Sequence, residues 1–427
     1  MNAPLNSALL IQKSNQMVVD ESWMKRIWEW ADEFEIPEED IPRNRDGLLA
    51  IKSLSFVMNY WKNERCEDIK YKILSKVKCI PDEVTYITNL LAFEIIGLRL
   101  NYLPNNIGRL VNLTTLKVNN NEFRALPDSI CQLTNLTELE INNNELEELP
   151  ESIGQLTNLT KLHIDYNSLR KLPESIGNLT NLTELKINNN ELKELPDSIG
   201  QLTNLTKLHI GYNNLKELPE SIGMLTNLID FNINSNELKE LPESIGQLAN
   251  LTRLYADYNN LKYLPESIGQ LINLISLQLD YNNLEELPQS IVKLTNLLDF
   301  DVDNNQLRDL PEGIGQLTNL ERLRVGYNNL KELHQSISKL KNLVYLDLTN
   351  NQLMRLPEDI DKLNSLIELR VSNNQLRQLP ESIGKLANLA KLRVSGNQLR
   401  RLPKSFSQLT NLTEIKLDNN YIRELHD

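Results

Sequence analysis

Apolar residues recur along this chain in a pattern that repeats every 23 residues. Residues 149–171 read LPESIGQLTNLTKLHIDYNSLRK, and units with the same spacing begin at Leu103, Leu126 and Leu172. Later units keep the same spacing, without insertion or deletion, as far as Leu425. A strict period of this length predicts a solenoid, in which each unit forms one coil and stacks on the coil before it.

Each unit contains a short stretch in which apolar and polar side chains alternate, which is typical of a strand. In residues 149–171, Leu162 and Ile164 are expected to point into the core. Lys161, His163 and Asp165 are then expected to point to the opposite face. Stacked coils place such strands about 4.8 Å apart in one parallel sheet. The pattern therefore predicts an α/β solenoid shaped like a horseshoe, with a parallel sheet on its concave face.

An asparagine follows the strand at the same place in every unit from Asn121 to Asn420, and Asn167 is one example. An inward amide there can bond to backbone groups where the chain turns out of the strand, so we expect a structural role. Pro150 and Gly154 are expected to shape the outer arc by fixing one φ angle and relaxing another. The Leu-x-x-Leu-x-Leu-x-x-Asn core is the signature of a leucine-rich repeat.

The first part of the chain departs from this period. Trp23, Ile27, Trp30 and Phe34 fall at helical spacing and predict an amphipathic helix over 21–34. We expect this helix to cover the first coil, because solenoid ends need caps, with partner binding as the alternative. A second helix is expected near 67–77. The predicted segments are a disordered N-terminus at 1–19, a helical N-terminal cap with a degenerate first repeat at 20–79, and the leucine-rich repeat solenoid at 80–427.

Composition narrows the possible partners and the location. The formal net charge of −13 argues against binding to nucleic acid or to an anionic membrane, which attract basic surfaces. The three cysteines do not form a disulfide framework for so long a chain, and the N-terminus lacks a secretion signal. No run is long and apolar enough to span a membrane. We therefore expect a cytoplasmic protein and treat the recurring Asn-Leu-Thr triplet as a product of the repeat, not as a glycosylation site.

The unit LPxxIGxLxxLxxLxLxxNxLxx resembles the 23-residue class found in intracellular leucine-rich repeat proteins. These include Ras-associated scaffold proteins, plant relatives of the Ras group and many bacterial proteins. The resemblance covers residues 80–427 and implies a non-catalytic surface, generally the concave sheet, that recognises a protein or peptide. Two alternatives stay open: a bacterial effector delivered into a host cell by a specialised secretion system, and a scaffold that presents its N-terminal helices.

Residues at the same position of successive units are expected to form columns on the concave face. In the first of these columns, which contains Lys161, the charge alternates from coil to coil. Parallel neighbours lie about 4.8 Å apart, so each charge is expected to meet opposite charges on adjacent strands. Exposed pairs contribute less than about 1 kcal/mol each, which favours a role in fixing register over a role in binding. The alternation runs Glu138, Lys161, Glu184, Lys207, Asp230, Arg253 and resumes at Asp299, Arg322 and at Glu368, Lys391, Glu414.

Tyrosines in the other concave columns carry more information about binding. Neighbouring coils place Asn143, Asn189 or Ser235 where Tyr166 stands, so the fold does not require tyrosine there. Tyrosine and arginine dominate interface energetics, although a solvated row of rings is the alternative. The best candidate patch contains Tyr255, Tyr258 and Tyr281. The predicted partner-binding residues are His163, Tyr166, His209, Tyr212, Arg253, Tyr255, Asp257, Tyr258, Asp280, Tyr281, Asp299, Asp301, Arg322, Arg324, Tyr327 and Tyr345.

Catalytic and metal chemistry find little support in the sequence. Asp299, Asp301 and Asp303 share one strand face and could hold calcium, but Arg322 and Arg324 on the next strand favour charge pairing. No phosphate-binding glycine loop or nucleophile elbow is present.

The histidines do not form a metal site either. His163 and His209 share a column but stand two coils apart, about 10 Å, which is too far for one zinc ion. We therefore expect no enzyme activity, no cofactor and no metal site.

Overall fold

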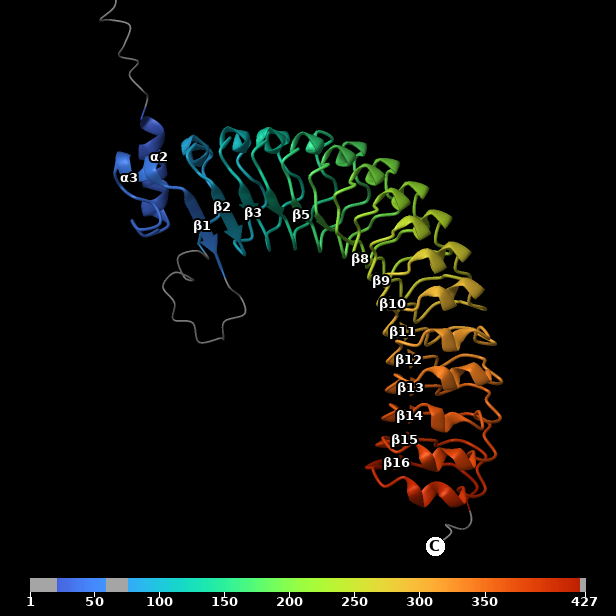
Figure 1. Ribbon diagram of the computed structural model, residues 1–427. Helices are drawn as coiled ribbons and strands as arrows, with labels where there is room; N and C mark the ends of the chain where they lie inside the picture. The colour runs from blue at the N-terminus through green and yellow to red at the C-terminus, as the bar shows by residue number, and fades with distance from the viewer. Residues whose placement is uncertain (1–20, 59–75, 423–427) are drawn as a thin grey trace, which may run out of the picture.

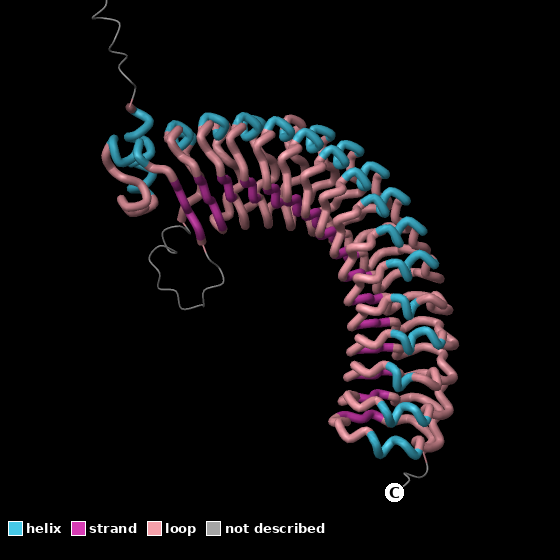
Figure 2. The backbone as a smooth tube through the Cα atoms, viewed as in Figure 1, coloured by secondary structure: helices cyan, strands magenta, loops and turns pink. Residues whose placement is uncertain are grey.

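The computed structural model describes residues 21–58 and 76–422, which form a curved solenoid (Figure 1). Figure 2 shows the strands along the inner side of the arc and most of the helical turns along its outer side. Within the described residues, sixteen parallel strands follow one another in chain order in one sheet. This arrangement confirms the predicted α/β horseshoe with a parallel sheet on its concave face.

The strands are short and evenly spaced along the sequence. The first two contain five residues each, and the later ones contain three. Their bounds are β1 Ser53–Val57, β2 Ala92–Ile96, β3 Thr115–Lys117, β4 Glu138–Glu140, β5 Lys161–His163, β6 Glu184–Lys186, β7 Lys207–His209, β8 Asp230–Asn232, β9 Arg253–Tyr255, β10 Ser276–Gln278, β11 Asp299–Asp301, β12 Arg322–Arg324, β13 Tyr345–Asp347, β14 Glu368–Arg370, β15 Lys391–Arg393 and β16 Glu414–Lys416.

Two α-helices and a series of 3-10 helices complete the described elements. The 3-10 helices stand one to a coil on the outer arc. The helices are α2 Ser22–Glu33, α3 Arg45–Ala50, η1 Asp82–Tyr86, η2 Ile107–Arg109, η3 Asp128–Gln132, η4 Ile153–Gln155, η5 Glu174–Asn178, η6 Asp197–Gln201, η7 Glu220–Met224, η8 Glu243–Gln247, η9 Glu266–Gln270, η10 Gln289–Lys293, η11 Ile314–Gln316, η12 Gln335–Lys339, η13 Ile360–Lys362, η14 Glu381–Lys385 and η15 Lys404–Gln408.

Neighbouring strands pair at the 23-residue offset that the repeat predicts. Lys161 lies beside Glu138, and Leu162 lies beside Leu139. Leu162 and Ile164 are fully buried, whereas Lys161 is exposed. The alternation within each strand therefore separates a continuous leucine core from a polar concave surface.

From Asn121 onward, the asparagine that follows the strand joins its coil to the preceding one. The Asn167 side-chain amide donates to the carbonyl oxygen of Ile141, one coil earlier, at 2.8 Å. Its side-chain oxygen accepts a hydrogen bond from the backbone N–H of Leu146, also one coil earlier, at 3.0 Å. The predicted structural role of this column is confirmed.

A second asparagine ladder runs through the Asn-Leu-Thr triplets. The Asn158 amide donates to the carbonyl oxygen of Thr134 in the preceding coil at 2.8 Å. The Thr160 hydroxyl likewise donates to the carbonyl oxygen of Thr137 at 3.0 Å. The triplet therefore has a bonding function of its own, which the sequence pattern did not indicate.

The outer arc needs glycine for space, not for backbone freedom. Gly154 lies in η4 and has no positive φ angle. A Cβ atom built on it would lie 2.2 Å from the carbonyl oxygen of Ser175 in the next coil. The prediction that Gly154 relaxes a φ angle is therefore wrong, because close packing of successive 3-10 helices requires this residue.

The N-terminal helix packs on the first coils. Trp23 and Ile27 of α2 are buried, and the Trp23 ring stacks on Tyr86 with a centroid distance of 5.5 Å. The Trp30 indole N–H donates to the carbonyl oxygen of Cys79 at 3.1 Å. The aromatic face of α2 thus covers the start of the solenoid. The helix expected near 67–77 lies outside the described residues, apart from 76 and 77, which are not helical.

Candidate functional site

The predicted partner-binding residues all lie on or directly after the concave strands. Nine of them stand within the strands, at His163, His209, Arg253, Tyr255, Asp299, Asp301, Arg322, Arg324 and Tyr345. The remaining seven follow the strands in two adjacent columns, at Tyr166, Tyr212, Asp257, Tyr258, Asp280, Tyr281 and Tyr327.

Five of these tyrosines have a left-handed backbone conformation. The φ angles of Tyr258 and Tyr281 are 51° and 52°, and those of Tyr166, Tyr212 and Tyr327 fall in the same range. Asparagine and glycine tolerate this conformation better than a bulky side chain does. Other coils do place asparagine in this column, as at Asn189. Tyrosine is therefore present despite the backbone, not because of it.

Tyr258 and Tyr281 form a stacked pair, which we call the central tyrosine pair. Their ring centroids lie 4.3 Å apart, and their planes differ by 9°. Half of Tyr258 and 46% of Tyr281 are exposed to solvent. In the same column, Asn304 separates Tyr327 from this pair. The 23-residue spacing of Tyr258 and Tyr281 predicts that they share a column. The stacking of their rings is seen only in the structure.

Tyr345 differs from the exposed tyrosines because its side chain is bound within the protein. Its hydroxyl donates to a carboxylate oxygen of Asp347 at 3.0 Å. The guanidinium groups of Arg324 and Arg370 lie 5.4 and 5.1 Å from its ring centroid. Burial and the negative charge of Asp347 raise the pKa of the Tyr345 hydroxyl. This residue is therefore less available to a partner than the central tyrosine pair is.

The alternating column predicts cross-strand charge pairs, and the described residues form some of them: Lys161 makes no ion pair with Glu138 or Glu184, whereas later members do pair. Arg253 contacts Asp230 on the neighbouring strand at 3.0 Å. Arg322 contacts Asp299 at 3.1 Å. Arg324 contacts both Asp299 at 2.9 Å and Asp301 at 3.4 Å. These contacts confirm charge pairing at Asp299 and Asp301.

Carboxylates on this face have two opposite electrostatic environments. Glu184 contacts Lys186 at 2.5 Å and Lys207 at 3.5 Å. Burial alone would raise the pKa of Glu184, but the hydrogen bond and the charge of Lys186 lower this pKa to about 2. Asp280 is half-buried, and burial together with the charges of Asp301 and Asp257 raises its pKa to about 7.

Asp303 resembles Asp280. Burial and the charge of Asp301 raise the pKa of Asp303 to about 7 as well, although its carboxylate accepts a hydrogen bond from the N–H of Gly326. Across 21–58 and 76–422, no ion pair involves Asp257, Asp280 or Asp303, in contrast to the cross-strand pairs of Glu184 and Asp299. Sequence reasoning did not find this unpaired row.

The two concave histidines stand apart. His163 and His209 lie on β5 and β7, with β6 between them. His209 lies 3.2 Å from Asp230, whereas burial and the charge of Lys186 lower the pKa of His163. Within the described part of the chain, no cluster of histidine, cysteine or carboxylate side chains is arranged to hold a metal ion. None of the helices in that same part is long and apolar enough to cross a membrane.

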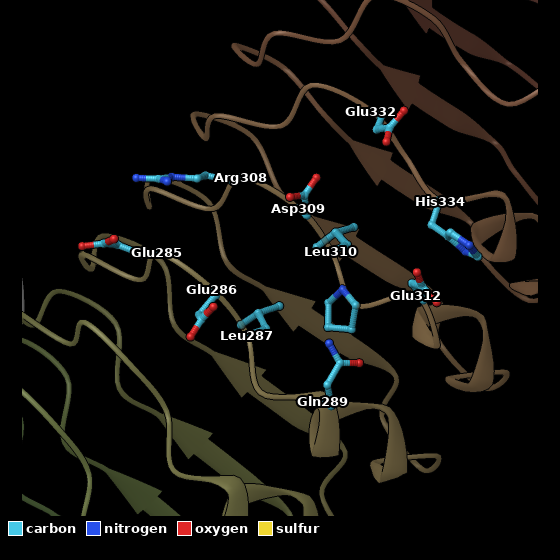
Figure 3. Close-up of a pocket in the computed structure, with 11 residues that line it drawn as sticks. Glu285, Glu286, Leu287, Gln289, Arg308, Asp309, Leu310, Glu312, Glu332 and His334 are labelled. Carbon is cyan, nitrogen blue, oxygen red and sulfur yellow. The ribbon is translucent and has the colours of Figure 1, made fainter.

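A recess of about 470 Å³ lies on the flank between the strands and the outer helices, away from the concave columns (Figure 3). Glu286, Asp309 and Glu312 are among its lining residues, together with His334. His334 replaces the usual proline, and its Nδ1 atom accepts a hydrogen bond from the Ser336 N–H at 3.1 Å. The repeat pattern does not predict this recess.

Several solved structures share this architecture. A leucine-rich repeat protein of Leptospira interrogans, LIC12759, is 31% identical, with a TM-score of 0.74 over 89% of this chain and 94% of that one. The plant peptide hormone receptor RGFR1, solved in complex with RGF2, is 28% identical, with a TM-score of 0.58 over 80% of this chain and 65% of that one. YopM from Yersinia enterocolitica is 28% identical, with a TM-score of 0.55 over 82% and 73%.

Family models match most of the chain. The model for a leucine-rich repeat region matches residues 73–166, 151–215, 258–343 and 326–425, and a leucine rich repeat model matches 203–261. No curated protein sequence gives a significant match. The matched segments cover well over half of the sequence and coincide with the coils of the solenoid. The chain belongs to the leucine-rich repeat family.

Proposed function

We propose that this protein binds a protein or peptide partner on its concave face, with the central tyrosine pair as the main contact. The family and fold are typically those of non-enzymatic interaction modules. The structural neighbour RGFR1 is a peptide hormone receptor whose structure contains the peptide RGF2, which supports a partner of this class.

The observation that carries the proposal is the stacked, half-exposed pair at Tyr258 and Tyr281. Left-handed positions occupied by bulky residues cost on the order of 1 kcal/mol each and concentrate at functional sites. Stacked rings also present a large rigid surface that loses little side-chain entropy on binding. Tyr166 and Tyr212 share the backbone conformation but lie beside smaller residues, so they offer no such combined surface.

Substitution by asparagine tests the proposal without disturbing the fold, because asparagine is the residue that other coils place in this column. We would purify the full chain with its bound partners and quantify them by mass spectrometry. The variant Tyr258→Asn/Tyr281→Asn should lose the partner, and the matched control Tyr166→Asn/Tyr212→Asn should keep it. A partner that both variants retain equally would place binding elsewhere.

A further inference from the structure

The row of three aspartates beside the central tyrosine pair carries a further inference. Asp257, Asp280 and Asp303 lie two residues after the ends of β9, β10 and β11 and form one column. Parallel neighbours are about 4.8 Å apart, so the row is about 10 Å long. Like charges placed directly opposite each other destabilise a sheet. Asn188, Asn234 and Gly326 occupy this column in other coils, so the fold itself does not require carboxylates here.

The nearby arginines form their ion pairs with other carboxylates than those of this row. Arg322 and Arg324 form their ion pairs with Asp299 and Asp301. No ion pair within residues 21–58 and 76–422 reaches Asp257, Asp280 or Asp303. Asp257 instead accepts a hydrogen bond from the Asn234 amide at 3.4 Å, and Asp303 accepts one from the Gly326 N–H. All three side chains are half-buried, so water compensates their charge only in part. The row therefore lacks cations that a bound molecule could supply.

The tyrosines extend the same surface. Tyr258 and Tyr281 directly follow Asp257 and Asp280 in the sequence, which places a stacked aromatic surface beside the carboxylates. Lysine and arginine side chains suit such a surface, because their apolar stems and cationic ends both interact favourably with aromatic rings. Arginine can also form paired hydrogen bonds with a carboxylate.

We propose that the partner presents a basic, extended segment to this surface, with lysine or arginine side chains reaching Asp257, Asp280 and Asp303 beside the central tyrosine pair. Alternate side chains of an extended segment lie about 7 Å apart, so two of them fit within the row of about 10 Å. The segment should therefore carry basic residues at positions i and i+2. This inference rests on the proposed function and identifies the chemistry of the partner.

The test uses two labelled probe peptides, one with arginine and one with glutamate at alternate positions in a glycine-serine background. Fluorescence anisotropy with the full chain should detect binding of the arginine peptide and not of the glutamate peptide. Asp257→Asn/Asp280→Asn/Asp303→Asn should weaken this binding at least tenfold. Asp165→Asn/Asp418→Asn alters the same column where no row exists and should leave the affinity unchanged. Asparagine occupies this column at Asn142 and Asn188, so both variants should fold normally, which thermal melting would check.

The natural partner separates failure of this inference from failure of the proposed function. A partner that is lost from Tyr258→Asn/Tyr281→Asn but retained by the triple aspartate variant would overturn the basic segment and leave the proposed function intact. A partner retained by both variants would overturn both proposals. Equal binding of the two probe peptides, or equal weakening by the control variant, would also overturn the basic segment.

Discussion

The side-chain amide of Asn259 donates to the carbonyl oxygen of Ile233, which lies 26 residues earlier and one coil away, at 3.0 Å. The Asn259 side-chain oxygen accepts from the N–H of Leu238 in that same coil, also at 3.0 Å. One buried side chain thus satisfies backbone groups that no neighbouring strand reaches. Repetition of this contact along the arc holds successive coils together.

Asn259→Ala should therefore lower the free energy of unfolding by about 1–3 kcal/mol, because it removes the partner of the buried Leu238 N–H and leaves the Ile233 carbonyl with only the Asn236 side-chain amide, at 3.1 Å. Asn260 is the matched control, since its side chain is exposed and its backbone bond to Leu238 survives substitution. Asn260→Ala should change stability by less than about 0.5 kcal/mol. Urea titration followed by circular dichroism measures both, and equal losses would contradict the role assigned to Asn259.

Packing on the outer arc predicts a loss of stability in Gly154→Ala. The added Cβ would lie 2.2 Å from the Ser175 carbonyl oxygen, a backbone atom that cannot move without shifting the next coil. We expect a loss of about 1–3 kcal/mol. Gly326→Ala is the control, because its Cβ would approach no atom closer than 3.2 Å. A melting temperature that is unchanged in Gly154→Ala would show that the coils are packed less closely than described.

The left-handed backbone at Tyr212 predicts opposite effects for two substitutions. Its φ angle is 54°, and the side chain is exposed. Tyr212→Asn should leave the melting temperature equal or higher, since asparagine tolerates this conformation. Tyr212→Val should cost about 1–2 kcal/mol, because a β-branched side chain crowds the backbone there. Thermal melting compares the two, and equal stability would contradict the strain assigned to this column.

The aspartate row predicts a dependence of stability on pH. The pKa values of Asp280 and Asp303 are raised to about 7 in the native state, above their ordinary value of 3.8. Between these values the native state holds protons that the unfolded chain has released, so stability falls as pH rises from about 4 to about 7. One pKa unit corresponds to about 1.4 kcal/mol. Because both side chains are only half-buried, solvent screens part of the effect, and we expect a fall of roughly 2 kcal/mol, well below the full sum of the two shifts. Asp280→Asn/Asp303→Asn should lose most of this fall, and an identical pH profile in the variant would contradict the raised pKa values.

The stacking of coils could be predicted from the sequence, because a strict period makes residues 23 positions apart lateral neighbours. This is why the predicted roles of Leu162 and Asn167 were correct, as was the cross-strand pairing of charges at Asp230 and Asp299. Spacing alone does not reveal a backbone dihedral or a rotamer. The left-handed φ of Tyr258 and its stacking on Tyr281 therefore emerged only in three dimensions, as did the close approach at Gly154.

Other features were visible in the sequence but not interpretable there. The asparagine at the position of Asn158 recurs in successive units. The sequence does not reveal its hydrogen bond to the preceding coil, such as that of Asn158 to Thr134, because this bond depends on how the turn before the strand is oriented. The unpaired state of Asp280 depends on which carboxylates Arg324 reaches, and that choice is made by side-chain geometry.

Cross-linking from the central tyrosine pair tests the central claim most directly. A photoreactive benzoylphenylalanine would replace Tyr281 in the full chain, and in a second protein it would replace Tyr263, which is 52% exposed in the segment between β9 and η9. With partner present, irradiation should link the partner to position 281 and not to position 263. Equal cross-linking at both positions, or cross-linking at position 263 alone, would contradict binding on the concave face.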